Sequence, residues 1–426
     1  MKSPRGRVRG QALSAQLELG GVEDDDFDIL QDAQRHPCCR PAAAAWLTVA
    51  AGLLMMLSSF FDLLPSIGRL EPPPAAPPPP PPPSAPTRLQ LIIDTDMAFD
   101  VDDVGAVCVA HALADLHEVD ILAVVHDAGL FEGVGAAGAL NTYYGRPNIQ
   151  LGAFKGKFGA NVAGPYVRDL ASRFPSPVLN YSQVPSCGEA YRRALSTAPD
   201  GSVAIAAIGF MVCLRDLLMS GADEFSSFNG RELVAKKVTK VVFQGGWYAP
   251  LHPNGHDTFN WNCGRGWGFN PSDDGCNGAA QYVLANMPPT VQMIFSDIGD
   301  EVLHGGKLTT CAAPTNPCRQ AYVDYLGPGG SRQSWDPVVV MLAVRGPERS
   351  FGSLTDVGFH NVADDKGANF WSAPKQGETK PSLQAQFTLD GTYPFEWATP
   401  RAALSNALDE LLCHAPRLAS DDSTHR

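Results

Sequence analysis

Residues 89–105, LQLIIDTDMAFDVDDVG, constrain the fold of this chain more than any other stretch. They open with the short, mainly apolar run 89–93, which is typical of a buried strand. Five aspartates lie within the ten residues that follow: Asp94, Asp96, Asp100, Asp102 and Asp103. Residues 104–113 are apolar and alanine-rich and predict a helix. The carboxylates therefore lie where the carboxyl end of a strand meets the start of a helix, which is the usual ligand crevice of an open α/β sheet.

This concentration of negative charge predicts a metal site. Neighbouring carboxylates repel one another and take up protons unless a cation neutralises them. A hard divalent cation with oxygen ligands is the natural partner. The alternative is an acidic helix start, in which one or two aspartates face the helix dipole and the others are solvated. Capping explains one or two of the five carboxylates, so the sequence favours the metal.

Residues 88–416 continue the alternation of strands and helices, and they predict one α/β domain. Strand-like runs are expected at 119–125, 202–208, 238–244 and 291–296. Helical stretches are expected at 134–144, 189–196, 212–219, 279–286 and 337–344. This order predicts an open, mostly parallel sheet with helices on both faces.

Polar residues that follow the predicted strands are candidates for the site. Asp127 follows the second strand, and a long loop after the fourth contains Asn260 and Asn262. Asp336 stands in the segment SWDP, just before the apolar helix VVVMLAV. By itself, an aspartate that precedes a proline at the first helical position predicts an N-cap. Beside the first aspartate cluster, metal ligation by Asp336 is the better interpretation.

The first 87 residues predict a membrane anchor. Residues 1–41 are polar and unpatterned and predict a disordered tail. Residues 42–64 begin with twenty uncharged residues, enough to cross a bilayer core of about 30 Å. Arginines before this segment predict a signal-anchor helix with the tail in the cytoplasm and the domain lumenal or extracellular. A buried helix of a soluble domain is the alternative.

Low-complexity segments complete this predicted topology. Residues 65–87 include seven consecutive prolines and predict a polyproline II linker, which would hold the domain away from the membrane. Residues 417–426 predict a disordered C-terminal tail. The chain is thus expected to be a single-pass, type II membrane protein. Its net charge of −13 argues against a nucleic acid partner.

Cysteine spacing agrees with an oxidising compartment. Two pairs, Cys263 with Cys276 and Cys311 with Cys318, lie in loop-like segments and are expected to form local disulfides. Two further cysteines, Cys108 and Cys213, stand in apolar runs and are expected to be unreactive core residues.

The run DTDMAFDVDDVGA resembles the N-terminal signature of the nucleoside hydrolase family, of the inosine–uridine preferring type. That family has the pattern DxDxxxDD, whereas five residues separate Asp96 from Asp102 here. The resemblance places the final pair on Asp102 and Asp103. It implies hydrolysis of the N-glycosidic bond of ribonucleosides, which releases the free base and ribose. The family tends to form homo-oligomers.

Later segments extend the resemblance over nearly the whole domain. AIAAIGFMVCL is similar to a family strand whose backbone carbonyl binds calcium, and that position is Ile208. SWDP resembles the family's H-D-P segment, with Trp335 at the position of a histidine linked to leaving-group protonation. FNWN is similar to the family's E-F-N segment, with Thr258 at the position of the glutamate. HDAG is similar to a G-N turn and places Asp127 where an asparagine is usual.

The resemblance implies a mechanism that depends on Ca²⁺. The expected calcium ligands are Asp96, Asp103, the carbonyl of Ile208 and Asp336. A water molecule activated by the metal would attack C1′ of the sugar, and Asp96 would accept its proton. The expected ribose-binding residues are Asp102, Asp127, Asn260 and Asn262. Asp94 is expected to lie behind the ligands and orient them, and Asp100 is either a ligand or a surface carboxylate.

The leaving group is the weak point of this mechanism. Trp335 can stack on a base or donate a hydrogen bond, but it cannot act as an acid. Two histidines of the long loop, His252 and His256, are alternative acids.

Two other functions stay open. A protein that binds Ca²⁺ or a ribosyl ligand without turnover would account for the departures at Trp335 and Thr258. A haloacid-dehalogenase-type phosphatase, with Asp94 as nucleophile, would account for the strand that ends in DTD. It would leave the Asp102–Asp103 pair and the SWDP segment unexplained.

Overall fold

The computed structural model describes residues 88–156, 164–246, 276–300, 302–364, 367, 369–374, 376–377, 381–391 and 396–417. The chain divides into two compact units, Met1–Pro80 and Pro81–Arg426, and all the described residues belong to the second. The predicted tail, membrane segment and linker lie outside the described residues. In the part of the chain that is described, no helix is both long enough and apolar enough to cross a membrane.

An eight-stranded sheet in the order β3-β2-β1-β4-β5-β6-β12-β9 forms the centre of the domain. Its strands are β1 (Gln90–Thr95), β2 (Asp120–His126), β3 (Gln150–Ala153), β4 (Val203–Ala207), β5 (Val238–Gln244), β6 (Gln292–Ser296), β9 (Gly352–Thr355) and β12 (Gln384–Leu389). All neighbours pair in parallel except β12 and β9. Two small antiparallel ribbons pair β7 (Leu303–His304) with β8 (Arg332–Gln333) and β10 (His360–Ala363) with β11 (Asn369–Ser372).

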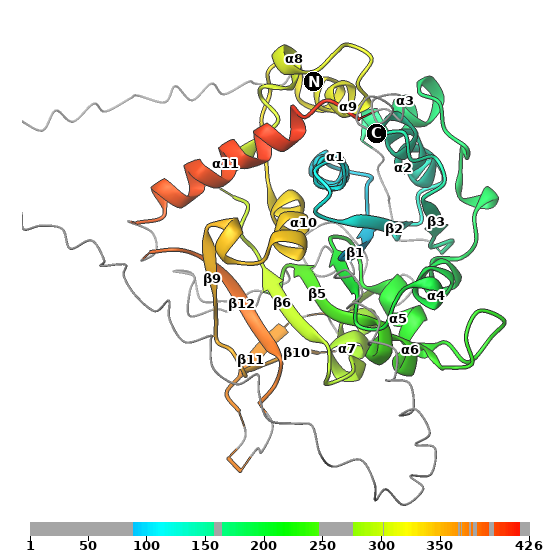
Figure 1. Cartoon of the computed structure of the whole chain (residues 1–426), viewed down its shortest axis with the longest axis vertical. Helices are drawn as coiled ribbons and strands as arrows, with labels where there is room; N and C mark the ends of the chain where they lie inside the picture. Colours follow the sequence, from blue (N-terminus) through cyan, green and yellow to red (C-terminus); the bar gives the residue numbers. More distant parts are fainter. Residues whose placement is uncertain are drawn as a thin grey trace, which may run out of the picture. The chain divides into compact units, whose positions relative to one another are not determined.

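Helices cover both faces of this sheet, as the sequence predicts (Figure 1). One set packs together: α1 (Asp102–Asp115), α2 (Gly133–Tyr143), α3 (Pro165–Arg173), α8 (Leu308–Cys311), α9 (Pro317–Leu326), α10 (Trp335–Arg345) and α11 (Ala398–Leu412). The other set is α4 (Cys187–Thr197), α5 (Val212–Met219), α6 (Gly230–Lys237) and α7 (Cys276–Asn286). Short 3₁₀ turns lie at Tyr181–Gln183 and Glu348–Ser350.

The strand order places a topological switch point at the end of β1. The chain runs from β1 outward to β2 and β3, and then returns to place β4 on the opposite side of β1. Connections therefore leave the ends of β1 and β4 in opposite directions, and such a switch point is where open α/β sheets bind ligands. Asp94 and Ile208 meet there, because the Ile208 amide donates a 2.8 Å hydrogen bond to the Asp94 carbonyl.

Two buried, apolar helices, α1 and α10, begin beside this switch point. Every residue of α1 is buried, and α10 is buried from Asp336 to Ala343. A helix that is apolar on all sides has to be covered all round. α1 and α10 pack against each other, and α10 also contacts β4 and β5. The aspartates in the first turn of each helix are therefore buried in the interior.

The disulfides differ from the expected pairing. Cys108 bonds to Cys318, Cys187 to Cys213, and Cys311 to Cys413. The prediction of a local Cys311–Cys318 bond was wrong, because the two cysteines face different helices, α11 and α1. Cys108 and Cys213 are buried in the core, as expected, but the sequence did not predict that each forms a disulfide. Their partners lie on neighbouring helices, α9 and α4. Cys263 and the Cys276 side chain lie outside the described residues.

Candidate active site

The strand end and two helix starts bring the aspartates of the sequence motif together. Asp96 follows β1 directly, Asp102 and Asp103 open α1, and Asp336 lies in the first turn of α10. Asp102, Asp103 and Asp336 are 2%, 1% and 5% exposed, whereas Asp96 and Asp100 keep more exposure. Asp336 belongs to the helix itself, and Ser334 occupies the N-cap position. Its side chain is therefore available to the carboxylate cluster.

Hydrogen bonds fix the turn that follows β1. The Thr95 hydroxyl donates to Asp103 Oδ1, and it also accepts a 3.2 Å bond from the Met97 amide. His126 Nε2 contacts the Met97 carbonyl at 3.0 Å. The Tyr166 hydroxyl donates to the Asp100 carbonyl. The loop that carries Asp96 and Asp100 is thus held at both ends.

Burial and mutual repulsion raise the pKa values of these carboxyls. For Asp96, Asp102, Asp103 and Asp336, removal from water is the largest cause. The charges of neighbouring aspartates raise each pKa further, and Asp336 responds to all four of Asp96, Asp100, Asp102 and Asp103. Five carboxyls are therefore close enough to interact. Their negative charge is neutralised either by bound protons or by added positive charge.

One arginine, which sequence reasoning missed, supplies part of that charge. Arg332 on β8 donates from Nη2 to Asp100 at 2.6 Å and from Nε to Asp102 at 3.2 Å. Its guanidinium carbon also lies over the Trp335 ring, 5.1 Å from the centroid. The sequence left the role of Asp100 open, and the structure pairs its carboxylate with Arg332. No spacing rule identifies Arg332, because the chain separates it from Asp102 by 230 residues.

A second carboxyl pair lies deeper. Asp94 and Asp127 are both fully buried, and the Tyr191 hydroxyl donates a 2.8 Å bond to Asp94 Oδ2. Burial raises the pKa of Asp94 to about 8. Burial and the charges of Asp94 and Asp96 raise the pKa of Asp127. Gly209 permits this packing, since a β-carbon there would lie 2.5 Å from Asp127 Oδ1.

The remaining predicted residues divide between the site and the undescribed loop. Ile208 directly follows β4, and Trp335 is the first residue of α10. Trp335 packs on Gly299, where a β-carbon would lie 2.3 Å from the indole. Asn260 and Asn262 lie outside the described residues, as do Thr258 and the two loop histidines.

The donor chemistry suits a hard divalent cation. Among the residues that the structure describes, no three His, Cys, Asp or Glu side chains stand in a ready-made metal-binding arrangement. In the described part of the chain, the buried carboxyls with raised pKa values nevertheless outnumber the one guanidinium that faces them, that of Arg332. Oxygen ligands of this kind are those that Ca²⁺ and Mg²⁺ prefer.

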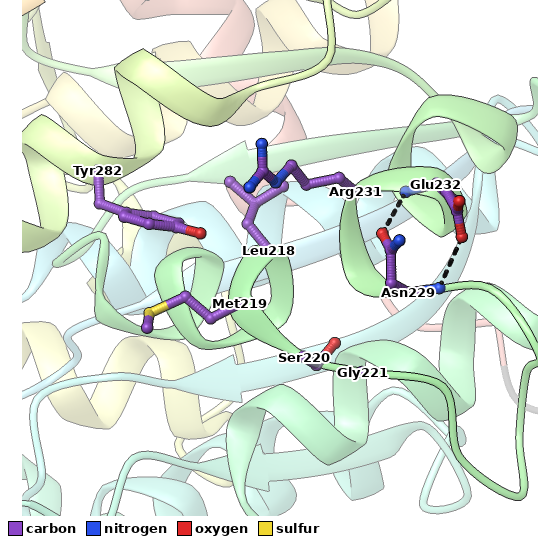
Figure 2. A pocket seen from close by; sticks show the side chains of 8 residues that line it. All are labelled: Leu218, Met219, Ser220, Gly221, Asn229, Arg231, Glu232 and Tyr282. Atoms are coloured by element: carbon purple, nitrogen blue, oxygen red, sulfur yellow. Dashed lines mark hydrogen bonds between the residues drawn. The ribbon is translucent and has the colours of Figure 1, made fainter.

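A separate hollow lies on α5, α6 and α7 (Figure 2). It measures about 520 Å³ and is lined by Leu218, Met219, Ser220, Gly221, Asn229, Arg231, Glu232 and Tyr282. Asn229 and Glu232 already satisfy each other in a capping box at the start of α6. None of the predicted site residues lines this hollow.

Comparison with solved structures identifies the architecture. The chain is similar to the purine-preferring ribonucleoside hydrolase from Gardnerella vaginalis, with a TM-score of 0.51 and 16% identity over 76% of this chain and 99% of that one. It is also similar to the type III effector protein XopQ, solved with adenosine diphosphate ribose, with a TM-score of 0.52 and 14% identity over 78% and 96% of the two chains. No family model and no curated protein sequence matches the chain. The chain therefore has a nucleoside hydrolase-like fold.

Proposed function

We propose that this protein hydrolyses the N-glycosidic bond of ribonucleosides, giving the free base and ribose, in a reaction that depends on Ca²⁺. The observation that carries the proposal is the convergence of Asp96, Asp102, Asp103 and Asp336 at the switch point of a nucleoside hydrolase-like sheet. The name of the Gardnerella protein, a ribonucleoside hydrolase, supports the same chemistry.

The residues divide into three roles in this proposal. Asp96, Asp103, the Ile208 carbonyl and Asp336 would hold Ca²⁺, which would supply a positive charge that lowers the pKa of water. Asp96 accepts the proton of the attacking water as general base. The ribose hydroxyls are bound by Asp102, Asp127, Asn260 and Asn262. Asp94 and Asp100 orient the residues beside them, Asp94 through β1 and Asp100 through its ion pair with Arg332.

The proposed leaving-group residue is Trp335. Its indole N–H can donate a hydrogen bond to the departing base, but it has no proton to transfer at neutral pH. The proposal therefore favours nucleosides whose base departs without full protonation.

Release of free ribose tests the function. The full chain is incubated with a panel of purine and pyrimidine nucleosides, in Ca²⁺ or in chelator. Asp96→Ala is the inactive variant, and Asp120→Ala is the control, because Asp120 only pairs with Arg88 on an exposed strand start. Release that requires Ca²⁺ and is lost only in Asp96→Ala is the expected result. No release from any nucleoside would refute the proposal.

A ribosyl-ligand-binding protein is the second candidate. Arg332 already engages Asp102, the carboxylate assigned to the ribose, and XopQ was solved with adenosine diphosphate ribose. Calorimetry with adenosine diphosphate ribose and with inosine separates the two functions. Tight binding of either compound without ribose release would favour the second candidate.

We also propose that residues 42–64 anchor the chain in a membrane, with the domain on the lumenal or extracellular side. Three disulfides among the described residues support an oxidising compartment. Protection of the domain from protease in sealed membranes, lost on adding detergent, is the expected result. Release of the chain from membranes by alkaline carbonate would contradict the anchor.

A further inference from the structure

Arg332 is held more firmly than an ordinary surface arginine. Each side-chain nitrogen has a partner: Nε donates to Asp102 at 3.2 Å, Nη1 to Gln333 at 3.1 Å and Nη2 to Asp100 at 2.6 Å. The guanidinium carbon lies over the Trp335 ring. The side chain is 18% exposed. Three hydrogen bonds and a contact with the Trp335 ring therefore hold the Arg332 side chain in place.

The backbone around Arg332 is fixed as well. In the ribbon of β7 and β8, Arg332 pairs with His304, and His304 Nδ1 lies 2.6 Å from the Ser334 hydroxyl. The His304 ring also contacts the Tyr322 hydroxyl. Ser334 leads directly into α10, whose first turn carries Asp336. The contacts that fix the backbone of Arg332 therefore also fix the start of α10, which carries Asp336.

The two carboxylates that Arg332 joins differ in their own support. Asp102 is 2% exposed and belongs to the rigid helix α1, whereas Asp100 belongs to the loop before it. Arg332 has a fork of donors in a fixed plane, so a contact with each carboxylate sets their relative orientation. A lysine has one donor head and cannot reproduce that geometry.

We propose that Arg332 is a positioning residue, which orients Asp102 toward the 2′- and 3′-hydroxyls of the substrate ribose. Arg332 thereby sets a preference for ribosides over 2′-deoxyribosides. This inference rests on the proposed function, because it assigns Asp102 to the sugar. Arg332 itself touches neither the scissile bond nor the attacking water.

The experiment compares a ribonucleoside with its 2′-deoxy counterpart in the full chain. Values of kcat/KM are measured for the natural protein, Arg332→Met and Arg332→Lys. Loss of a residue that orients a substrate-binding group costs about 10–100-fold in activity. We expect that loss for the riboside in Arg332→Met, mostly as a higher KM. The deoxyriboside loses much less, so the preference for ribosides falls, and Arg332→Lys gives an intermediate preference.

Arg345→Met is the matched control. Arg345 ends α10, has 16% side-chain exposure and donates to Glu118 at 3.0 and 2.7 Å. It resembles Arg332 in burial and in its fork of contacts, but it lies at the end of α10 that is far from the carboxylate cluster. We expect Arg345→Met to leave the riboside preference unchanged. If Arg332→Met folds poorly, Asp100→Ala removes the second carboxylate that holds the arginine and is expected to lower the preference in the same direction.

The possible results distinguish a failure of the role of Arg332 from a failure of the proposed hydrolase function. An active natural protein whose preference is unchanged in Arg332→Met and Arg332→Lys would overturn the role of Arg332 and leave the proposed function standing. Equal losses for both sugars would also overturn it, because a purely structural contact affects both substrates alike. A natural protein that releases no ribose from any nucleoside would overturn the function and the role of Arg332 together.

Discussion

Gly299 has no room for a side chain, because the indole of Trp335 lies against its α-carbon. A β-carbon there would lie 2.3 Å from Trp335 Cδ1 and 2.6 Å from the Trp335 backbone nitrogen. We expect Gly299→Ala to displace Trp335 and to lower the free energy of unfolding by about 1–3 kcal/mol, the usual cost of overpacking. Urea unfolding of the full chain measures the change.

A second glycine supplies the control for this prediction. Gly278 is the third residue of α7, and among the described residues no atom beyond its own helix and chain neighbours lies within 4 Å of its built β-carbon. Alanine is favoured over glycine in a helix by about 1 kcal/mol, so Gly278→Ala is expected to raise stability. Equal effects of the two substitutions would show that Trp335 is free to move away from Gly299.

At the level of single residues, the sequence predicted the carboxylates but not their partners. A run of aspartates after an apolar strand is a local signal, and Asp96, Asp102 and Asp103 meet as that signal predicts. Arg332 and Tyr166 reach the same loop through the tertiary fold alone. Local patterns carry no information about such long-range contacts.

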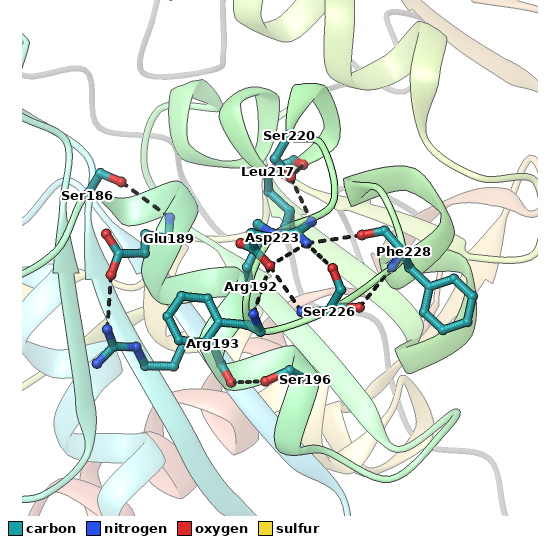
Figure 3. Close-up of polar contacts among 11 residues, drawn as sticks. Ser186, Glu189, Arg192, Arg193, Ser196, Leu217, Ser220, Asp223, Ser226 and Phe228 are labelled. Carbon is teal, nitrogen blue, oxygen red and sulfur yellow. Dashed lines mark hydrogen bonds and ion pairs between the residues drawn. The ribbon is translucent and has the colours of Figure 1, made fainter.

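Among the elements, the loop between α5 and α6 depends on one buried arginine of α4 (Figure 3). Arg192 is 3% exposed and makes two bonds to Asp223, of 2.5 and 2.8 Å. It also donates to the carbonyls of Ser226 and Phe228. We expect Arg192→Met to lower the free energy of unfolding by about 2–4 kcal/mol, because several acceptors lose a charged donor together.

The neighbouring surface pair is the control. Arg193 and Glu189, on the same helix, are about 44% and 42% exposed and form an i,i+4 pair. Removal of such a pair costs about 0.3–0.5 kcal/mol. Glu189→Gln breaks this pair and leaves the contact of Arg193 with the Phe225 ring of the loop in place. A loss in Arg192→Met as small as that in Glu189→Gln would contradict the view that Arg192 holds the loop.

The Arg192–Asp223 pair also predicts a pH dependence. Hydrogen bonds from Arg192 lower the pKa of Asp223 to about 2, from an ordinary value of 3.8. A carboxyl whose pKa is lowered by folding stabilises the protein above its unfolded pKa, and that contribution is lost as the pH falls toward 2. We therefore expect the stability gap between the natural protein and Asp223→Asn to be full above pH 4 and to shrink between pH 4 and pH 2. Urea titrations at several pH values measure the gap, and a gap that grows on acidification would contradict the assignment.

The predicted helices and strands are confirmed where their apolar residues form a clear pattern. Elements without such a pattern were not predicted. The expected strand at 238–244 and helix at 212–219 match β5 and α5 residue for residue. Strand β12, in contrast, contains Gln384, Gln386 and Thr388, all buried. Polar side chains inside a sheet hide it from a search for apolar runs. Helix α11 is only partly buried, and polar residues interrupt its apolar ones, so no long apolar run marks it in the sequence.

For the whole molecule, the excess of buried carboxyls makes stability depend on both pH and divalent cations. Burial raises the pKa of Asp94 to about 8, and it also raises the pKa values of Asp96, Asp102, Asp103 and Asp336. A carboxyl whose pKa is raised by folding stabilises the protein fully below its unfolded pKa, and that contribution is lost as the pH rises through its folded pKa. Of the histidines that the structure describes, His111, His126 and His304 have lowered pKa values; they are neutral in both states above pH 7 and do not oppose this trend.

We therefore expect the chelated protein to lose stability between pH 7 and pH 9, and Ca²⁺ to restore it most at the higher pH. A cation that binds only the folded state at 100 times its dissociation constant adds about 2.7 kcal/mol. Urea unfolding with Ca²⁺ or with chelator at both pH values measures this effect. In Asp336→Asn the cluster loses one carboxylate, so the Ca²⁺ effect is expected to weaken. The same loss of stability with and without Ca²⁺ would mean that protons alone, and no cation, neutralise these carboxyls.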